Sequence, residues 1–128
     1  MDLDRLSPQQ RKLMKDAYEA MVLAEIDSYS VLQSSKGERK DLFVIDVRDE
    51  DAYANGHIPG AHNIPYEEIE KKFRTIPRDK TAVVYCWSAD CMLAPRAALK
   101  LSQLDIFPKV LRTGWYEWIA QKRQVEKR

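Results

Sequence analysis

The chain has 128 residues and a mass of 14.9 kDa, the length of a single domain. Lys and Arg number 21 against 20 Asp and Glu, and the resulting formal net charge of +1 gives no overall attraction to nucleic acid or to anionic membranes. No apolar run approaches the roughly 18 residues that a membrane span needs, and the first residues lack the apolar stretch of a secretory signal. We therefore expect a cytoplasmic globular domain without nucleic-acid or membrane partners.

The first predicted element is a helix over residues 7–24. Ser7 is a good N-cap, Pro8 suits the first helical position, and Gln10 stands where a capping box requires it. An apolar stripe at helical spacing follows, formed by Leu13, Ala17, Met21 and Ala24. We expect this stripe to pack on the core, and the alternative is a helix that binds a partner.

Strand and helix patterns alternate along the rest of the chain. A short helix over 29–33 and a polar loop over 34–40 precede them. Strands are predicted over 42–45, 62–64, 81–85 and 109–111, and helices over 66–73, 94–104 and 115–123. Such alternation indicates βαβ units and a parallel sheet covered by helices on both faces. Residues 121–128 carry four bases and one acid, and we expect a solvated, frayed tail.

Two predicted strands end in residues that can carry chemistry. Asp46 and Arg48 follow the first strand and Cys86 follows the third, so they meet at the edge of the sheet where ligands bind in such folds. The loop after Cys86 leads into a helix, and loop amides together with a helix N-terminus attract anions and lower the pKa of a thiol. Cys86 is accordingly predicted to be a reactive thiolate, although cysteine is also a common small core residue.

The second cysteine, Cys91, lies five residues later. Two cysteines are too few for a disulfide framework, and a zinc site would also need His57 and His62. We expect free thiols in a reducing compartment and no metal. Cys91 has three interpretations: a packed thiol, a resolving cysteine that attacks a modified Cys86, or a relay that passes sulfur onward.

Four strings in this order resemble the signatures of the rhodanese-like family: DVR (46–48), GHIPGAHNIP (56–65), VVYCW (83–87) and GWYEW (114–118). The resemblance extends over roughly residues 25–119. It implies a three-layer α/β/α fold with a central parallel sheet of about five strands. The chain would then comprise an N-terminal helical extension (1–24), a rhodanese-like domain (25–120) and a basic C-terminal tail (121–128).

The resemblance also implies a sulfurtransferase without a cofactor. Cys86 would carry a persulfide, taken from a donor such as thiosulfate and passed to cyanide, a small thiol or a protein thiol. The loop that would hold the persulfide and the donor comprises Trp87, Ser88, Ala89, Asp90, Cys91, Met92 and Leu93. This loop departs from the short rhodanese loops because it has no glycine and no early base. It also contains Asp90, whose charge would repel dianionic thiosulfate if it faced the pocket.

Supporting roles are expected for four residues near the site. The resemblance favours structural roles for Asp46 and Arg48, as an ion pair or in loop hydrogen bonds. His57 is expected to fix its loop by hydrogen bonds, because sulfur transfer needs a thiolate rather than a proton shuttle. Arg96, in the first turn of the following helix, either faces solvent or lowers the pKa of Cys86.

Two other functions are compatible with this pattern. Cysteine-dependent phosphatases and arsenate reductases carry a Cys-x5-Arg loop, in which the arginine binds the oxyanion through two hydrogen bonds. The position that needs this arginine holds Met92, and Arg96 comes four residues late, so this activity is not expected. The second alternative is a non-catalytic or regulatory binding module, which the acidic loop leaves open.

Overall fold

The computed structural model describes residues 5–128 and contains a parallel sheet of four strands flanked by helices. Its strands are β1 (Leu42–Asp46), β2 (His62–Asn63), β3 (Thr81–Tyr85) and β4 (Lys109–Val110), in the spatial order β2-β1-β3-β4. All the pairings between them are parallel, and Asp46 lies opposite Tyr85 at the carboxyl end of the central pair. The predicted α/β architecture is confirmed. In place of a fifth strand, Glu25 makes an isolated parallel bridge to Val110.

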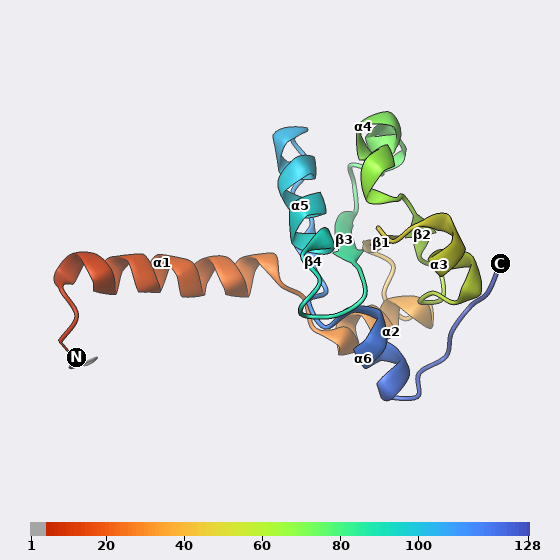
Figure 1. Ribbon diagram of the computed structural model, residues 1–128, viewed down its shortest axis with the longest axis horizontal. Helices are drawn as coiled ribbons and strands as arrows, with labels where there is room; N and C mark the ends of the chain where they lie inside the picture. Colours follow the sequence, from red (N-terminus) through yellow and green to blue (C-terminus); the bar gives the residue numbers. More distant parts are fainter. Residues whose placement is uncertain (1–4) are drawn as a thin grey trace.

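Helices cover both faces of the sheet (Figure 1). Side chains from α2 (Ser28–Ser35) and α6 (Gly114–Ala120) pack on one face, and those from α4 (Ile69–Lys72) and α5 (Leu93–Gln103) pack on the other. Strand residues alternate between these two hydrophobic clusters: Val83 and Tyr85 belong to the first, and Val84 and Cys86 to the second. Cys86 therefore faces α5.

The remaining connections are short. The predicted helix over 66–73 is divided into two 3-10 turns, η1 (Tyr66–Glu68) and η2 (Phe73–Thr75), on either side of α4. Helix α3 (Glu50–Asn55), between β1 and β2, has no counterpart in the sequence prediction. Its signal is present in the sequence, because Asp49 caps the helix by accepting a hydrogen bond from Ala52 N–H, and Glu50 and Asp51 suit the first turn.

The N-terminal helix α1 (Pro8–Ala24) has the predicted capping box, in which Ser7 and Gln10 hydrogen-bond reciprocally. The prediction that it packs on the core is wrong. None of its residues is buried, and it extends away from the domain in Figure 1. The helix is joined to the domain at its C-terminal end, where Glu25 bridges to Val110 and Lys109 Nζ donates to Leu23 O at 2.7 Å. Residues 1–4 of the predicted extension lie outside the described residues.

The C-terminal tail is docked, and the prediction of a frayed tail is wrong. Glu126 pairs antiparallel with His57 through two backbone hydrogen bonds of 2.9 Å. Trp118 Nε1 donates to Gln124 O, and Arg128 N–H donates to Ala54 O. The charges of the tail could not predict these contacts, because most of them are backbone hydrogen bonds, which do not depend on the side chains present.

Among residues 5–128, none of the helices has the length and hydropathy of a membrane-spanning segment.

Candidate active site

Cys86 follows β3 at the carboxyl edge of the sheet and is 2% exposed. Its Sγ accepts a hydrogen bond of 3.3 Å from Ala94 N–H, in the first turn of α5. No side chain caps this helix, so the sulfur satisfies one of the amide groups that a helix N-terminus leaves without an intrahelical partner. The same helix end is suited to hold negative charge on a sulfur atom or on a bound anion.

The loop after Cys86 folds back so that Cys91 lies beside it. Cys91 N–H donates to Ser88 O at 3.0 Å and closes the turn, and Cys86 Sγ donates to Cys91 O at 3.5 Å. Both cysteines are free thiols, with Cys86 buried and Cys91 half-buried. Cys91 therefore lies between the deep sulfur and the exposed rim of the loop.

The two thiols differ in acidity, and Cys86 is the weaker acid of the pair. Burial raises the pKa of Cys86 to about 11, and its hydrogen bond with Cys91 contributes to the rise, against the lowering effect of Ala94 N–H. Burial also acts to raise the pKa of Cys91. The hydrogen bond from Cys86 and those from the Leu93 and Trp87 amides outweigh it and lower that pKa overall. The expected low pKa of Cys86 is thus wrong, because desolvation outweighs the helix end and loop amides; the first negative charge rests on Cys91.

This order of acidity predicts the order of alkylation. At pH 7.5 to 8, iodoacetamide should modify Cys91 well before Cys86, because only a thiolate reacts and Cys86 is both protonated and buried. Peptide mass spectrometry over time measures both rates. Cys91→Ser removes the ionisable thiol, and with it the negative charge of Cys91 that raises the pKa of Cys86. The pH midpoint for Cys86 alkylation should then fall below its wild-type value, and an unchanged midpoint would contradict the coupling.

Asp46 and Arg48 form a buried ion pair beneath the loop. Arg48 Nη2 donates to Asp46 Oδ2 at 2.7 Å and to Gly56 O at 2.6 Å, and both side chains are at most 1% exposed. Tyr85 O–H also donates to Asp46 Oδ2, at 2.7 Å, and Ile58 N–H donates to the Tyr85 oxygen. Burial and the Asp46 charge raise the pKa of Tyr85, which keeps its proton for this hydrogen bond.

The guanidinium group of Arg48 also packs against two tryptophan rings, one in the loop and one in α6. The Arg48 Cζ atom lies 4.5 Å from the Trp87 ring centre and 4.8 Å from that of Trp115. Trp115 N–H donates to Cys86 O at 2.9 Å, and Tyr116 N–H donates to Trp87 O at 2.9 Å. The start of α6 therefore holds the backbone at Cys86 in place, and the Trp87 ring packs on Arg48 rather than standing free in the loop.

Gly114 is a site residue that the sequence analysis quoted in a motif without giving it a role. Its φ is +68°, and an added Cβ would lie 2.7 Å from Cys86 O and 2.9 Å from the carbonyl carbon of Trp87. Backbone atoms cannot yield as a flexible side chain can, so glycine is needed here for the close approach of α6 to the loop.

Gly114→Ala should lower both stability and activity. The left-handed φ and the contact with Cys86 O together are expected to cost about 2 to 4 kcal/mol of unfolding free energy, and the displaced loop should slow modification of Cys86. Gly37→Ala is the matched control, since Gly37 has a φ of +76° but nothing within 4 Å of its added Cβ. Urea unfolding measures both variants, and equal losses would contradict the proposed contact.

The other predicted supporting residues lie at different distances from the thiols. His57 is buried, and its Nδ1 and Nε2 are hydrogen-bonded to Tyr53 O and Glu126 Oε1, contacts that join α3 and the C-terminal tail. Its neighbour Gly56 provides the link to Arg48. Arg96 is exposed on α5, and its charge lowers the pKa of Cys91 rather than that of Cys86.

The outer part of the loop faces solvent. Ala89, Asp90 and Met92 are exposed, whereas Trp87, Ser88 and Leu93 are half-buried. Water and salt therefore screen the Asp90 charge, and its repulsion of an anionic donor should be a fraction of that for a buried charge. No cluster of three or more potential metal ligands of the His, Cys, Asp or Glu type occurs within residues 5–128.

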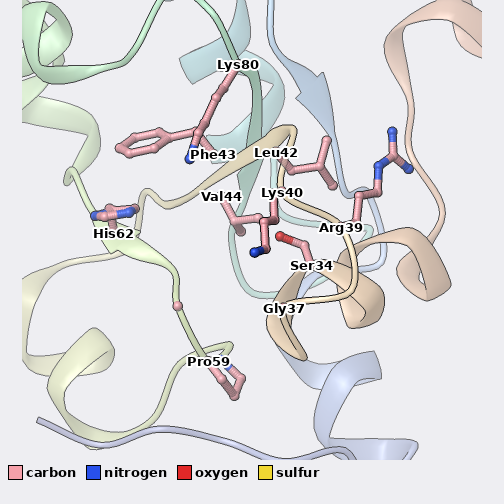
Figure 2. A pocket seen from close by; sticks show the side chains of 11 residues that line it. Ser34, Gly37, Arg39, Lys40, Leu42, Phe43, Val44, Pro59, His62 and Lys80 are labelled. Carbon is pink, nitrogen blue, oxygen red and sulfur yellow. The ribbon is translucent and has the colours of Figure 1, made fainter.

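A cavity of about 280 Å³ lies away from the cysteines, along the start of β1 (Figure 2). The Phe43 and His62 rings stack at 4.1 Å between centres beside it, and Lys40 and Lys80 extend toward it. Arg39 also lines the cavity, but its guanidinium is held by Asp41 at 2.7 Å. None of the loop residues 86–93 takes part, so this cavity is separate from the thiol site.

Residues 28–121 of the sequence match the family model of the rhodanese-like domain. The chain belongs to the rhodanese-like domain family. An HTH-type transcriptional regulator of Mycobacterium tuberculosis, Rv0324, is 36% identical over 81 residues, which are 63% of this chain and 36% of that protein. A protein named sulfurtransferase from Allochromatium vinosum is 36% identical over 64 residues, 50% of this chain and 59% of that protein. The chain thus spans only part of these curated relatives.

Solved structures agree with this rhodanese-like fold. The crystal structure of the BH2092 protein from Bacillus halodurans superposes with a TM-score of 0.82 and 30% identity. The match covers 91% of this chain and 86% of the other. The recognised family and the fold expected from the four sequence strings are therefore confirmed, while the domain limits at 25 and 120 stay a prediction.

Proposed function

We propose that this rhodanese-like protein is a sulfurtransferase that moves a sulfane sulfur through a persulfide on Cys86. The observation that carries the proposal is the hydrogen bond of 3.3 Å from Ala94 N–H to Cys86 Sγ. It holds the sulfur at the N-terminus of α5, where a persulfide anion would be stabilised. The name of the Allochromatium vinosum relative supports the same class of activity.

The first half-reaction begins with the two thiols sharing one negative charge. The Cys86 proton passes to the Cys91 thiolate as Cys86 Sγ attacks the outer sulfur of the donor. With thiosulfate, the S–S bond of the donor breaks and sulfite leaves with the bonding electrons. A disulfane anion, Cys86–S–S⁻, remains beside the Ala94 amide.

The second half-reaction transfers the outer sulfur to the acceptor. A nucleophile such as cyanide, a small thiol or a protein thiol attacks that sulfur, and Cys86 leaves with the electrons of the S–S bond. Cyanide becomes thiocyanate, and a thiol becomes a persulfide. Cys91 then returns the proton to Cys86, so the cycle needs no cofactor.

Cys91 is also the candidate for a relay or resolving thiol. As a relay, Cys91 first passes its proton to the outer sulfur of the Cys86 persulfide. The Cys91 thiolate then attacks that sulfur and displaces the Cys86 thiolate, so that the sulfur reaches the rim of the loop. As a resolving thiol, it attacks the inner sulfur, releases hydrogen sulfide and forms a Cys86–Cys91 disulfide. Free thiols of this kind fit a reducing compartment, and on this ground we propose a cytoplasmic location.

Intact-protein mass spectrometry after thiosulfate or a persulfide donor tests the proposal. The expected result is a gain of about 32 Da, the mass of one sulfur atom, which peptide mapping places on Cys86 in the wild type and in Cys91→Ser. Later movement of the adduct to Cys91 would support the relay, and a loss of about 2 Da relative to the reduced chain would support the resolving role. No adduct with either donor would overturn the proposal and favour a non-catalytic binding module.

A further inference from the structure

The cavity shown in Figure 2 lies beside the first half of β1, where the sheet has a gap. β2 pairs with β1 only from Ile45 onward, which lies opposite His62. The chain before β2 leaves the line of the strand in a turn, in which Ala61 N–H donates to Ile58 O at 3.0 Å and Gly60 has a φ of +81°. Within the described part of the chain, the first half of β1 therefore has no neighbouring strand on this side.

Two backbone N–H groups of β1 face this gap. Thr81 N–H of β3 donates to Asp41 O at 2.8 Å, so the Asp41 carbonyl points toward β3. Because successive residues of a strand direct their hydrogen bonds to opposite sides, the N–H groups of Leu42 and Val44 and the Leu42 carbonyl between them point toward the β2 side. None of these three groups has a hydrogen-bond partner among residues 5–128. Water or a ligand in the cavity must therefore satisfy them.

The cavity is also positively charged. Lys40 and Lys80 extend toward it from the segments that precede β1 and β3, and neither is ion-paired with any of residues 5–128. The third base, Arg39, is paired with Asp41 at 2.7 Å and points away in Figure 2. None of the residues that line the cavity, all within 34–80, is acidic. The excess charge acts on His62, whose pKa is lowered by burial and by the Lys80 charge.

This combination of groups matches the chemistry of phosphate. Ammonium groups and backbone N–H groups both donate to phosphate oxygens, and here they come from different sides of the cavity. A tetrahedral ion with several oxygens can accept from all of them, whereas a single carboxylate has its two oxygens in one plane. The Leu42 carbonyl needs a donor. Inorganic phosphate supplies one because it keeps at least one proton at neutral pH, and a phosphate monoester can supply one from a hydroxyl group of its organic part.

The size of the cavity limits the ligand. Its volume of about 280 Å³ is near the lower end for ligand pockets, about 300 Å³, and leaves room for a phosphate group with a small organic group. We propose that this cavity binds a phosphate group, either as inorganic phosphate or in a small phosphate monoester. The site lies at the start of β1, away from the thiols, and is independent of sulfur transfer.

Titration of the ¹⁵N-labelled full chain with inorganic phosphate, followed by NMR at constant ionic strength, tests the proposal. The Val44 amide signal should shift in a saturable manner, and the pKa of His62 should rise because the bound anion offsets the Lys80 charge. Sulfate should bind more weakly because it has no proton to donate to the Leu42 carbonyl, and equal affinity for sulfate would overturn the assignment to phosphate. Glycerol 3-phosphate distinguishes the two sources: tighter binding than inorganic phosphate supports a monoester, and weaker binding supports the free ion.

A pair of double variants tests the role of the lysines. Lys40→Gln/Lys80→Gln should raise the dissociation constant for phosphate by at least about tenfold, because it removes both unpaired charges at the cavity. The control Lys71→Gln/Lys127→Gln removes the same net charge from exposed lysines that do not line the cavity, and it should bind like the wild type. An equal loss in both double variants, or no saturable shift of the wild-type Val44 amide at about 50 mM phosphate, would overturn the proposal.

Discussion

Cys86→Ser should abolish sulfur transfer from thiosulfate to cyanide, with a loss of at least about a thousandfold in kcat/KM, because the proposed mechanism has no other group that can carry the sulfur. Serine has nearly the same shape, and its oxygen can still accept the hydrogen bond from Ala94 N–H. We therefore expect a change in unfolding free energy of no more than about 1 kcal/mol. Thiocyanate formation measures the activity, and thermal unfolding checks the fold.

Cys91→Ser is the matched control for this experiment. It changes the same atom type in the same loop, but it removes the proton acceptor and leaves the sulfur carrier in place. Sulfur transfer should remain measurable and should show a shifted pH profile. Turnover that persists unchanged in Cys86→Ser, or that is lost completely in Cys91→Ser alone, would contradict the assignment of the two thiols.

Arg48→Met should give the largest loss of stability among the variants considered. It leaves the Asp46 carboxylate and Gly56 O buried without their guanidinium partner. Breaking a buried ion pair from one side typically costs about 3 to 5 kcal/mol, which corresponds to a fall in melting temperature of about 10 °C or more for a domain of this size. Differential scanning calorimetry measures the change.

Arg39→Met provides a control within the same chain. Arg39 also pairs with an aspartate two residues away, Asp41, at 2.7 Å, but this pair is exposed. Its removal should have little effect on the melting temperature, because water replaces the lost partner. The double variant Asp46→Asn/Arg48→Met should recover part of the loss of Arg48→Met, since no uncompensated charge stays buried. Equal effects of Arg48→Met and Arg39→Met would contradict a structural role for the buried pair.

The edge of the sheet that carries the candidate site could be placed from local sequence patterns. The runs at 42–45 and 81–85 are continuous, apolar and rich in β-branched residues, so they predict strands buried on both faces. Because the strands are parallel, their carboxyl ends lie at the same edge of the sheet, and the residues that follow the strands lie close together there. The positions of Asp46, Arg48 and Cys86 in the chain therefore determined that they lie at this edge of the sheet.

The acidity of the thiols depended on tertiary structure. The loop amides and the helix start are visible in the sequence, but the burial of Cys86 under α5 and its hydrogen bond with Cys91 are not. Desolvation is the larger influence, and it depends on all the atoms packed around the sulfur. The same holds for Gly114, whose need for glycine arises from the backbone of residues 86–88, far away in the chain.

By itself, the sequence determined the order of the strands and of the helices other than α3, the capping of α1 and the residues that follow β1 and β3, because these follow from local periodicity, caps and spacing. Tertiary structure alone decided which way α1 points, how the tail is held and which cysteine is charged. The apolar stripe of α1 has the same spacing whether the helix packs on its own domain or extends from it, and only the folded structure shows that none of its residues is buried. The tail is held by Glu126 pairing with His57, which lies 69 residues away, and no local pattern records such a contact.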